Sequence, residues 1–396
     1  MGEKLVGTIA ETPRREIYFE YSPAWLAEGF SISPYFLPLT SGLKREESLV
    51  FEGLLGVFDD SVPDGWGRLL MDRFFRARGL PPESISPLDR LAYIGDHGIG
   101  ALRYRPAIAG VVAPGGVLNL PLVAEQAERI AAGSPEEALP VLQAIGGSSG
   151  GSRPKVFVTH HPTSGRLFPE GTGSEEGFEH WLVKFRTRED PADAGSIEAA
   201  YAEMARAAGI KIPATTLFDT TAGRFFAVQR FDRGPGEMRI HTHTFGGLAH
   251  SDFRHPNRDY QEFLTVTFDL TKDFAAVGQA YRRAVFNVLA HNRDDHVKNH
   301  AFVWALNGGW RLSPAYDLTH SYGVNGQHNM TVAGSGLPGV KELLTLADGA
   351  ALRPKEAKAI IDSVRAAIGD WPEFAAKAGV SEASVNRIGS SFVSLG

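Results

Sequence analysis

Alternation of apolar and polar residues dominates the start of the chain and is broken by short runs with helical spacing. Strict alternation indicates a half-buried strand, whereas apolar residues three or four positions apart indicate an amphipathic helix. Ser or Pro at the start of such a run and Gly at its end are typical of helix limits. The pattern predicts strands over residues 4–10 and 16–21, helices over 22–29 and 65–80, and a helix, a glycine turn and a strand over 88–106.

The middle of the chain changes from helical spacing to alternation. A linker over residues 111–121 and helices over 122–133 and 134–145 lead to a loop rich in glycine and serine, residues 146–155. After the loop the pattern predicts strands over 155–160, 165–170 and 180–185, a helix over 196–210, and a hairpin of strands over 210–220 and 223–233.

The last third is mainly helical, with one hairpin. Residues 241–260 contain several histidines and predict a polar loop. Two short apolar runs flank Asn307, Gly308 and Gly309, which are typical of a hairpin turn. The pattern also predicts helices over 273–291, 353–371 and 381–395.

The densest group of reactive residues lies around this hairpin. Asp294 and Asn299 precede its first strand and Asp317 follows its second, so we expect the three to converge at the ends of the hairpin. Mg²⁺ prefers hard oxygen ligands with substrate phosphates, and a phosphoryl acceptor needs a carboxylate to take its proton. The order is similar to that of a protein-kinase active site, although Asp317 lies in PAYDL rather than in Asp-Phe-Gly.

Two other interpretations of this stretch stay open at this point. It can be a solvated turn that caps a helix. His291, His296 and His300 also suggest a metal site, because His296 and His300 would share one face of a helix. A zinc hydrolase would require three ligands at suitable spacing and a base.

The loop over residues 146–155 offers unobstructed backbone N–H groups, which suit a phosphate. It is not a Walker A loop, because a strand rather than a helix follows Lys155. A flexible linker is the alternative. Lys184 lies in an apolar strand, as does the kinase lysine that neutralises nucleotide phosphates and pairs with a Glu on the next helix. Glu198 and Glu203 are the candidates for that Glu, with an ordinary solvated glutamate as the alternative.

The last strand before the helical third ends in Gln229, Arg230 and Phe231. In a kinase-like arrangement this exit would be the hinge, and these three residues would face the adenine.

Composition restricts the class of protein. The 396 residues are 43% hydrophobic and 22% charged, which is ordinary for a globular protein with two or three domains. The net charge of −6 argues against a nucleic-acid-binding surface over the whole chain, and the absence of cysteine excludes disulfides and thiolate chemistry. No signal peptide and no apolar run of about 20 residues is found, which predicts a cytoplasmic protein without membrane contact.

The order of elements and motifs over nearly the whole chain resembles the HipA-like serine/threonine kinases, the toxins of type II (HipBA-like) toxin–antitoxin modules. The most specific motifs are DDHVKNHAF and LSPAYDL; GGSSGGSRPK, VKF, AVQRFDR, FDDSVPDGWGR and IGDHGIGALRYRP add to them. The resemblance implies an α+β fold with a two-lobed, protein-kinase-like core after a small mixed α/β subdomain. It implies an N-terminal subdomain over 1–108, a small lobe with linker helices over 109–232, and a helical large lobe over 233–396.

The resemblance also implies roles for individual residues. Asp294 would be the catalytic base and Lys298 would lie near the transferred phosphate. The family pattern selects Asp294 over Asp295, and it makes His296 a brace of the loop beside ATP rather than a metal ligand. Asn299 and Asp317 would hold Mg²⁺.

ATP would contact the glycine-rich loop and its neighbouring strands. The implied ATP-binding residues are Ser149, Gly150, Gly151, Lys155, Lys184, Glu198, Gln229, Phe231 and His296. Gln229 departs from the Glu that is frequent in the family, so the adenine contact changes in detail.

Family members phosphorylate themselves on a serine of this loop. The register favours Ser148, with Ser149 next, and Ser152 lies further along the loop. A phosphoserine adds about −1.5 to −2 charges where ATP phosphates would bind, which gives a route to self-inactivation.

The implied partners are a HipB-like helix-turn-helix antitoxin, operator DNA reached through that antitoxin, and a protein substrate such as an aminoacyl-tRNA synthetase. A homodimer within the antitoxin complex is also implied. The non-enzymatic alternative is a degenerate kinase that serves only as an antitoxin-bound co-repressor.

Overall fold

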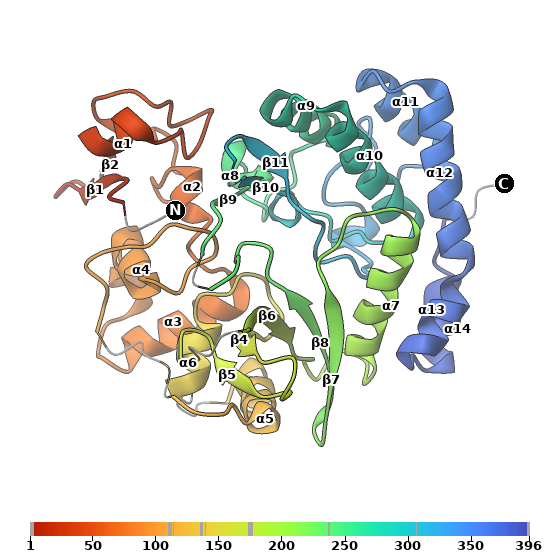
Figure 1. The fold of residues 1–396 in the computed structure, drawn as a ribbon, viewed down its shortest axis with the longest axis horizontal. Coiled ribbons are helices and arrows are strands. Elements are labelled where there is room, and N and C mark those ends of the chain that lie inside the picture. Colours follow the sequence, from red (N-terminus) through yellow and green to blue (C-terminus); the bar gives the residue numbers. More distant parts are fainter. Residues whose placement is uncertain are drawn as a thin grey trace. The chain divides into compact units, whose positions relative to one another are not determined.

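The computed structural model describes residues 4–109, 113, 115–134, 138, 140–172, 177–236, 238–305 and 307–393. The chain divides into two compact units (Figure 1). Unit 1 comprises residues 1–190, 219–243 and 247–250, and unit 2 comprises residues 191–218, 244–246 and 251–396. Parts of the predicted linker and of the helix predicted over 134–145 lie outside the described residues.

Unit 1 begins with the antiparallel sheet β1-β2-β3, and the predicted hairpin over 4–10 and 16–21 is confirmed. Ser22 accepts a hydrogen bond from the Trp25 N–H and so caps the first helix, as its sequence predicts. The elements of this part are β1 (Gly7–Glu11), β2 (Ile17–Tyr21), α1 (Pro23–Glu28), β3 (Lys44–Arg45), α2 (Gly56–Asp59), α3 (Gly65–Arg76), η1 (Pro82–Ser84) and α4 (Pro87–Ile94).

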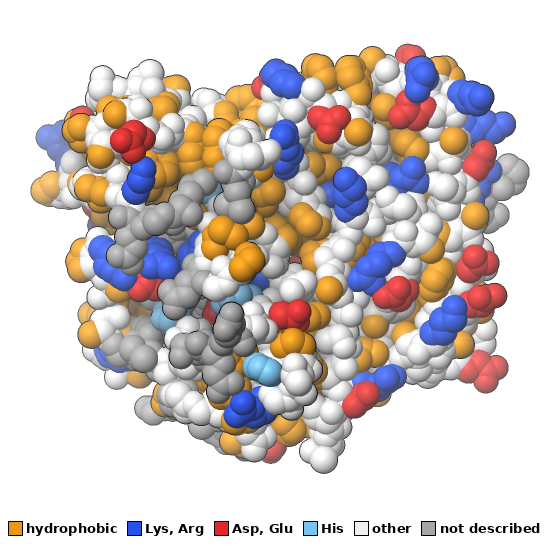
Figure 2. All heavy atoms as spheres, in the orientation of Figure 1, with side chains coloured by type: hydrophobic (Ala, Val, Ile, Leu, Met, Phe, Trp, Pro, Cys, Tyr) orange, Lys and Arg blue, Asp and Glu red, His pale blue; other side chains and the backbone are white. Residues whose placement is uncertain are grey.

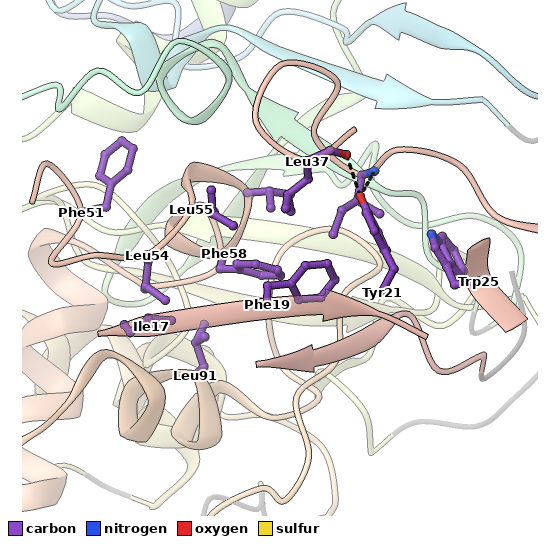
Figure 3. Close-up of a cluster of buried hydrophobic side chains, with 12 residues drawn as sticks. Ile17, Phe19, Tyr21, Trp25, Leu37, Phe51, Leu54, Leu55, Phe58 and Leu91 are labelled. Carbon is purple, nitrogen blue, oxygen red and sulfur yellow. Dashed lines mark hydrogen bonds between the residues drawn. The ribbon is translucent and has the colours of Figure 1, made fainter. Parts of the chain in front are cut away.

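One face of β2 packs into an apolar core (Figure 3). Phe19 packs against Phe58 with ring centres 5.1 Å apart, and both rings are buried. The buried hydroxyl of Tyr21 donates to the Leu37 carbonyl and accepts from the Ile32 N–H, as the dashed lines in Figure 3 show. The alternation in the sequence thus becomes one buried face of the sheet.

The second sheet of the chain has the strand order β5-β4-β6-β8-β7. The strands predicted after the glycine-rich loop are confirmed, and β4 pairs antiparallel with both β5 and β6. The elements of this region are α5 (Leu120–Ala131), α6 (Pro140–Gly146), β4 (Lys155–His160), β5 (Leu167–Pro169), β6 (Glu179–Lys184), β7 (Thr215–Thr220) and β8 (Gly223–Gln229). The division between the units falls within β7, after Phe218.

Unit 2 is mainly helical, as predicted. Helix α10 packs against α9 and α12, and α7 packs against α12 and α13. The remaining elements, of which β9 and α8 are divided between the units, are α7 (Ala194–Ala207), β9 (Thr242–Thr244), α8 (Phe245–Leu248), α9 (Tyr260–Thr271), α10 (Phe274–Leu289), η2 (Val297–Asn299), β10 (Ala301–Trp304), β11 (Trp310–Leu312), η3 (Val324–Gly326), α11 (Val340–Gly349), α12 (Pro354–Gly369), α13 (Trp371–Ala378) and α14 (Glu382–Gly389).

Two sequence expectations were wrong. Residues 101–106 do not form a strand, because the alternating segment has no ladder partner among the described residues. Residues 241–260 are not only a polar loop, since they contain β9 and α8. Helix α9 had no prediction, because its Thr, Val and Phe residues lower the helical signal.

Basic and acidic side chains are interspersed over α11, α12 and α13 on the face drawn in Figure 2. Arg365 and Asp362 form an ion pair on α12, and Arg353, the residue before this helix, pairs with Glu356. Among the described helices, none has both the length and the apolar composition that a membrane crossing demands.

Candidate active site

The stretch before β10 forms a short closed loop in unit 2. Asn299 donates its side-chain amide to the main-chain carbonyl of Asp294 at 2.7 Å, which fixes the two residues next to each other. Asp294 itself is exposed. Because the Nδ2 of Asn299 is used in this way, its Oδ1 is the side-chain atom that can coordinate a cation.

Asp317 lies beside this loop. The predicted hairpin is confirmed, and the Ser313 N–H donates to the Ala301 carbonyl just beyond the β10–β11 pairs. Past this point the hydroxyl of Tyr316 donates to the Lys298 carbonyl at 2.7 Å. The next residue, Asp317, is partly exposed and has a left-handed backbone with φ of +54°.

A second tie joins the same two segments. Residue 292 forms a bridge with Ser321, and the N–H of Ser321 donates to the His291 carbonyl at 3.0 Å. The segment around Asp317 therefore runs alongside the loop that carries Asp294 and Asn299. The predicted convergence of these two segments is present in unit 2.

Asp295 has a different environment from its neighbour Asp294. It is fully buried, and its Oδ2 accepts from the Tyr260 hydroxyl and lies 2.8 Å from His328 Nδ1. Its Oδ1 accepts from the Asn329 N–H at 2.9 Å. These contacts on the Asp295 carboxylate are structural, so Asp294, which is the exposed one of the two, is the candidate for contact with a substrate.

The histidines of the stretch do not form a metal site. Both ring nitrogens of His300 are buried without a hydrogen-bond partner, and burial, followed by the charge of Arg283, lowers the pKa of His300 to about 3. The His291 ring stacks on His320 with centres 5.2 Å apart. Among the described residues no three or more His, Cys, Asp or Glu side chains are placed to hold a metal ion. The Mg²⁺ site expected from the sequence, with Asp317, Asn299 and ATP oxygens as ligands, would need fewer protein carboxylates than such a cluster.

Lys298 and His296 share a contact that the sequence did not predict. The Nζ of Lys298 lies 5.4 Å from the centre of the Phe253 ring, and the His296 ring lies 5.0 Å from the same ring. An aromatic face attracts a cation. Phe253 therefore orients the two side chains.

In unit 1 the glycine-rich loop packs against the residues that begin α3. Trp66 donates its backbone N–H to the Gly151 carbonyl at 2.9 Å, and the Gly151 N–H donates to the Asp64 carboxylate. A Cβ on Gly67 would lie 2.2 Å from the Ser149 carbonyl. Only glycine fits there, which explains part of the GWG sequence. The loop is thus fixed rather than a free linker in this structure.

Both candidate serines of the loop are buried. Ser149 is 0% exposed, and its hydroxyl donates to the Gly146 carbonyl at 2.7 Å. Ser148 is 4% exposed, and its Oγ makes no hydrogen bond to a described residue.

Two lysines meet on adjacent strands behind this loop. Lys155 in β4 is the register partner of Lys184 in β6, and the two are only 7% and 8% exposed. The Nζ of Lys155 lies against Gly151, because a Cβ on that glycine would come within 2.5 Å of it. Like charges directly opposite each other destabilise a sheet, so an anion such as a phosphate suits this place.

The predicted hinge is held by a buried ion cluster. The Nη1 of Arg230 donates to both Glu170 oxygens at 2.7 Å, and its Nη2 donates to Asp232 at 2.6 Å. Burial raises the pKa of Glu170, but the charges of Arg230 and Arg233 and a hydrogen bond from His180 lower it to about 2.

The Arg230 side chain is therefore turned into the protein, so the expectation that it faces the adenine does not fit. Gln229 and Phe231 on either side are partly exposed and remain the candidates.

Of the two candidate glutamates on α7, Glu198 is buried and Glu203 is exposed beside Arg206. Burial favours Glu198 as a functional carboxylate. Lys184 belongs to unit 1 and Glu198 to unit 2, so their pairing stays a prediction.

Two family models match the chain. The model described as HipA-like C-terminal domain matches residues 147–371, more than half of the sequence, and the model of the HipA N-terminal domain matches residues 1–105. The chain belongs to the HipA-like family. The HipA-like C-terminal match includes all but the first residue of the glycine-rich loop, both lysines and the loop around Asp294.

Known relatives agree on the fold. A chain from the solved complex of HipA, HipB and operator DNA of the Shewanella oneidensis MR-1 toxin–antitoxin system has a TM-score of 0.71 and 18% identity. The match covers 98% of this chain and 94% of that chain. The predicted α+β, kinase-like fold is thereby confirmed.

A protein of Sinorhizobium fredii described as putative kinase Y4dM is 29% identical over 163 residues. The match spans 38% of this chain and 38% of the relative.

Sequence reasoning missed three residues that shape the candidate segments: Asp64 in unit 1, and Phe253 and Tyr316 in unit 2. Each acts on a segment distant from it or through a single contact, so none has a local motif. Asp64 directly precedes the GWG sequence. The two glycines of that sequence were the signal from which a close approach of another backbone could have been predicted.

Proposed function

We propose that the chain is an ATP- and Mg²⁺-dependent serine/threonine protein kinase of the HipA type. The observation that carries the proposal is the division of labour between two adjacent carboxylates. The Asp295 carboxylate is buried and accepts hydrogen bonds within the network, whereas Asp294 is exposed and its main-chain carbonyl accepts from the Asn299 side chain.

Each group has a defined role in the proposal. Asp294 accepts the proton of a serine or threonine hydroxyl, and Lys298 neutralises charge on the transferred phosphoryl group. Asn299 and Asp317 hold Mg²⁺, which neutralises phosphate charge when bound.

Most of the nucleotide-binding groups of the proposal lie in unit 1, whereas Glu198 and His296 belong to unit 2. Lys155, Lys184 and the amides of the glycine-rich loop bind ATP phosphates, and Gln229 and Phe231 contact the adenine. Glu198 orients Lys184. The opposed buried lysines and the contact of Lys155 with Gly151 support this assignment.

Self-inactivation is part of the proposed function. Ser148 is the favoured site, because the Ser149 hydroxyl already donates to Gly146. Both serines are buried, so the loop has to turn outward before either is phosphorylated. The added charge then disfavours ATP at the same loop.

The proposed partners follow from family membership. In this proposal the protein acts in the cytoplasm and is neutralised by a HipB-like antitoxin that carries it to operator DNA. The solved Shewanella structure is of a complex with these three components, HipA, HipB and operator DNA. We propose a protein substrate of the aminoacyl-tRNA synthetase class and a homodimer within the antitoxin complex.

The test is transfer of labelled γ-phosphate from ATP with Mg²⁺, followed by mass spectrometry of phosphopeptides. We expect Asp294→Asn to lower transfer by at least about a hundredfold, the scale of a lost general base, with no change in thermal unfolding. Asp269→Asn is the matched control, because Asp269 is an exposed aspartate of the same unit that pairs with Lys272.

The result also separates the kinase from a co-repressor. ATP binding without transfer to itself or to a proteome in the unaltered protein would support the non-enzymatic alternative. Equal labelling of wild type and Asp294→Asn would remove Asp294 as the base.

A further inference from the structure

A groove of about 860 Å³ crosses the first part of unit 1, within the range of about 300–1,000 Å³ typical of ligand sites. Its walls are residues 4–9, which include most of β1, and residues 101–106. Its floor is aromatic and aliphatic, and comprises Phe19, Trp25, Phe30, Ile32, Phe58 and Leu91. We call it the β1 groove.

The groove lies along the edge of β1 rather than over one face. Successive residues of a strand point to opposite faces, so a cavity over one face touches alternate residues. Here every residue from 4 to 9 lines the groove, and so does every residue from 101 to 106. The wall over residues 4–9 therefore follows the edge of β1, and residues 101–106, which form no strand, are the second continuous part of the lining.

The hydrogen bonds of β1 show which backbone groups face the groove. Ser22 N donates to Val6 O, and Thr12 N donates to the residue 16 carbonyl, so even-numbered residues make the bonds to β2. The N–H and C=O groups of Gly7 and Ile9 then point away from β2. Because β1 is an edge strand, these groups are a template for one more strand.

The sequence predicts that the alternating segment 101–106 is a strand. In the structure this segment pairs with no other described strand. A strand seated in the groove would lie next to both walls.

The charges around the groove are mainly positive. Lys4, Arg103, Arg105 and Arg239 line it together with Asp89. Lys4 pairs with Glu28, and the Asp96 carboxylate lies 2.6 Å from Arg105 and 4.0 Å from Arg103. The excess of positive charge comes from the three arginines around the one carboxylate of Asp96. Asp89 is already used in capping α4 with Ser86. The Nη1 of Arg239 is buried and has no hydrogen-bond partner among the described residues.

We propose that the β1 groove binds an extended segment of a partner protein by strand addition, and that this segment alternates carboxylates with apolar side chains. Main-chain hydrogen bonds to Gly7 and Ile9 supply affinity in this mode, and side-chain pockets supply specificity. The apolar residues of the segment cover the aromatic floor, and its carboxylates meet Arg103, Arg105 and Arg239. The proposal does not depend on kinase activity.

The test uses the full chain and a fluorescein-labelled octapeptide in which glutamate alternates with valine. Fluorescence anisotropy is expected to show saturable binding. A peptide with glutamine in place of glutamate tests charge, and one with alternate N-methylated amides tests strand pairing. Each is expected to bind at least tenfold more weakly. Arg239→Gln is expected to lower the affinity for the acidic peptide by about tenfold. Arg353→Gln, which changes an exposed arginine of unit 2, is expected to leave this affinity unchanged.

Amide exchange followed by NMR locates the peptide. We expect it to slow exchange at Gly7 and Ile9 and to leave Thr8 and Ala10, which already pair with β2, unchanged. The proposal is wrong if the acidic peptide does not bind up to 1 mM, if all three peptides bind equally, or if residues 4–9 gain no protection. Concentration-dependent dimerisation that protects Gly7 and Ile9 without peptide would assign the groove to a second copy of the chain and overturn the partner proposal.

Discussion

At the scale of single residues, the adjacent pair Asp294 and Asp295 is the central distinction. The two residues are both aspartates, and they differ only in where the fold directs their side chains. Asp295 is the acceptor at the centre of a buried network that continues from Tyr260 to Asn287 and Asn292. A buried network of this kind fixes the loop that presents Asp294.

The first prediction concerns Asp295→Asn. One acceptor oxygen becomes an NH₂ group that faces the donors Tyr260, His328 or Asn329, so a buried donor loses its acceptor. We expect the free energy of unfolding to fall by about 2–4 kcal/mol. Chemical denaturation followed by fluorescence measures this change.

Asp294→Asn is the matched comparison, because it makes the same chemical change at an exposed position one residue earlier. Its free energy of unfolding is expected to stay within about 0.5 kcal/mol of wild type. Equal destabilisation by both substitutions would contradict the separation of their roles.

Residue roles were only partly predictable from the sequence. The spacing of Asp294, Asn299 and Asp317 around a hairpin turn was enough to expect their segments to meet. The burial of Asp295 was not visible, because its partners Tyr260 and His328 are more than thirty positions away. No local pattern records such a contact.

At the scale of elements, the glycine-rich loop is shaped by the residues that begin α3. The Asp64 carboxylate accepts a hydrogen bond from the Gly151 N–H. The glycines at 65 and 67 allow the backbone at the start of α3 to approach the backbone of the loop closely. In the proposed kinase the same amide belongs to the loop that binds phosphates. A carboxylate therefore occupies a position where an anion is expected.

The second prediction is that Asp64→Asn tightens ATP binding. Asn keeps an acceptor for Gly151 but removes a negative charge beside the phosphate-binding loop. We expect the Kd for ATP to fall by about three- to tenfold, roughly 1 kcal/mol, which isothermal titration calorimetry can measure.

Asp72→Asn on the same helix α3 serves as the control, since Asp72 pairs with Arg68 away from the loop. Weaker binding by Asp64→Asn would show instead that the carboxylate is needed to order the loop for ATP.

Elements with a strong local pattern were predicted, and elements that depend on distant partners were not. The hairpin β1–β2 has alternation with a turn between its strands, and α12 has a continuous apolar stripe. The alternation of residues 101–106 was equally clear, but a strand exists only where another strand pairs with it. Because residues 101–106 have no pairing strand among the described residues, they line the β1 groove instead.

At the scale of the whole molecule, each unit contains buried ionisable groups whose folded state resists protonation. In unit 1 the charges of the arginines hold the carboxylates of Glu170 and Asp232 ionised, and their pKa values are lowered despite burial. Burial also lowers the pKa of His241 to about 4, with a further contribution from His243. All three groups make folding less favourable as the pH falls.

His241 and the two carboxylates lose their contributions to stability over different pH ranges. The contribution of His241 can therefore be measured separately from that of the carboxylates. A group whose pKa is lower in the folded than in the unfolded state stabilises the fold above its unfolded pKa. For His241 that stability is complete above about pH 6.5 and is lost as the pH falls toward 4. The carboxylates lose theirs only below about pH 4.5. Between pH 7.5 and 5 the change expected from His241 is roughly 2 kcal/mol.

The last prediction is that His241→Gln flattens the dependence of stability on pH between 7.5 and 5. The ring Nε2 lies 2.8 Å from the Ile32 carbonyl, and a glutamine amide can donate to the same oxygen without titrating. We expect the variant to be less stable than wild type at pH 7.5, by about 1 kcal/mol for imperfect packing, and more stable at pH 5. Urea unfolding at each pH measures the difference. His255→Gln, at an exposed histidine, is expected to run parallel to wild type, and a parallel curve for His241→Gln would contradict the neutral, buried state of His241.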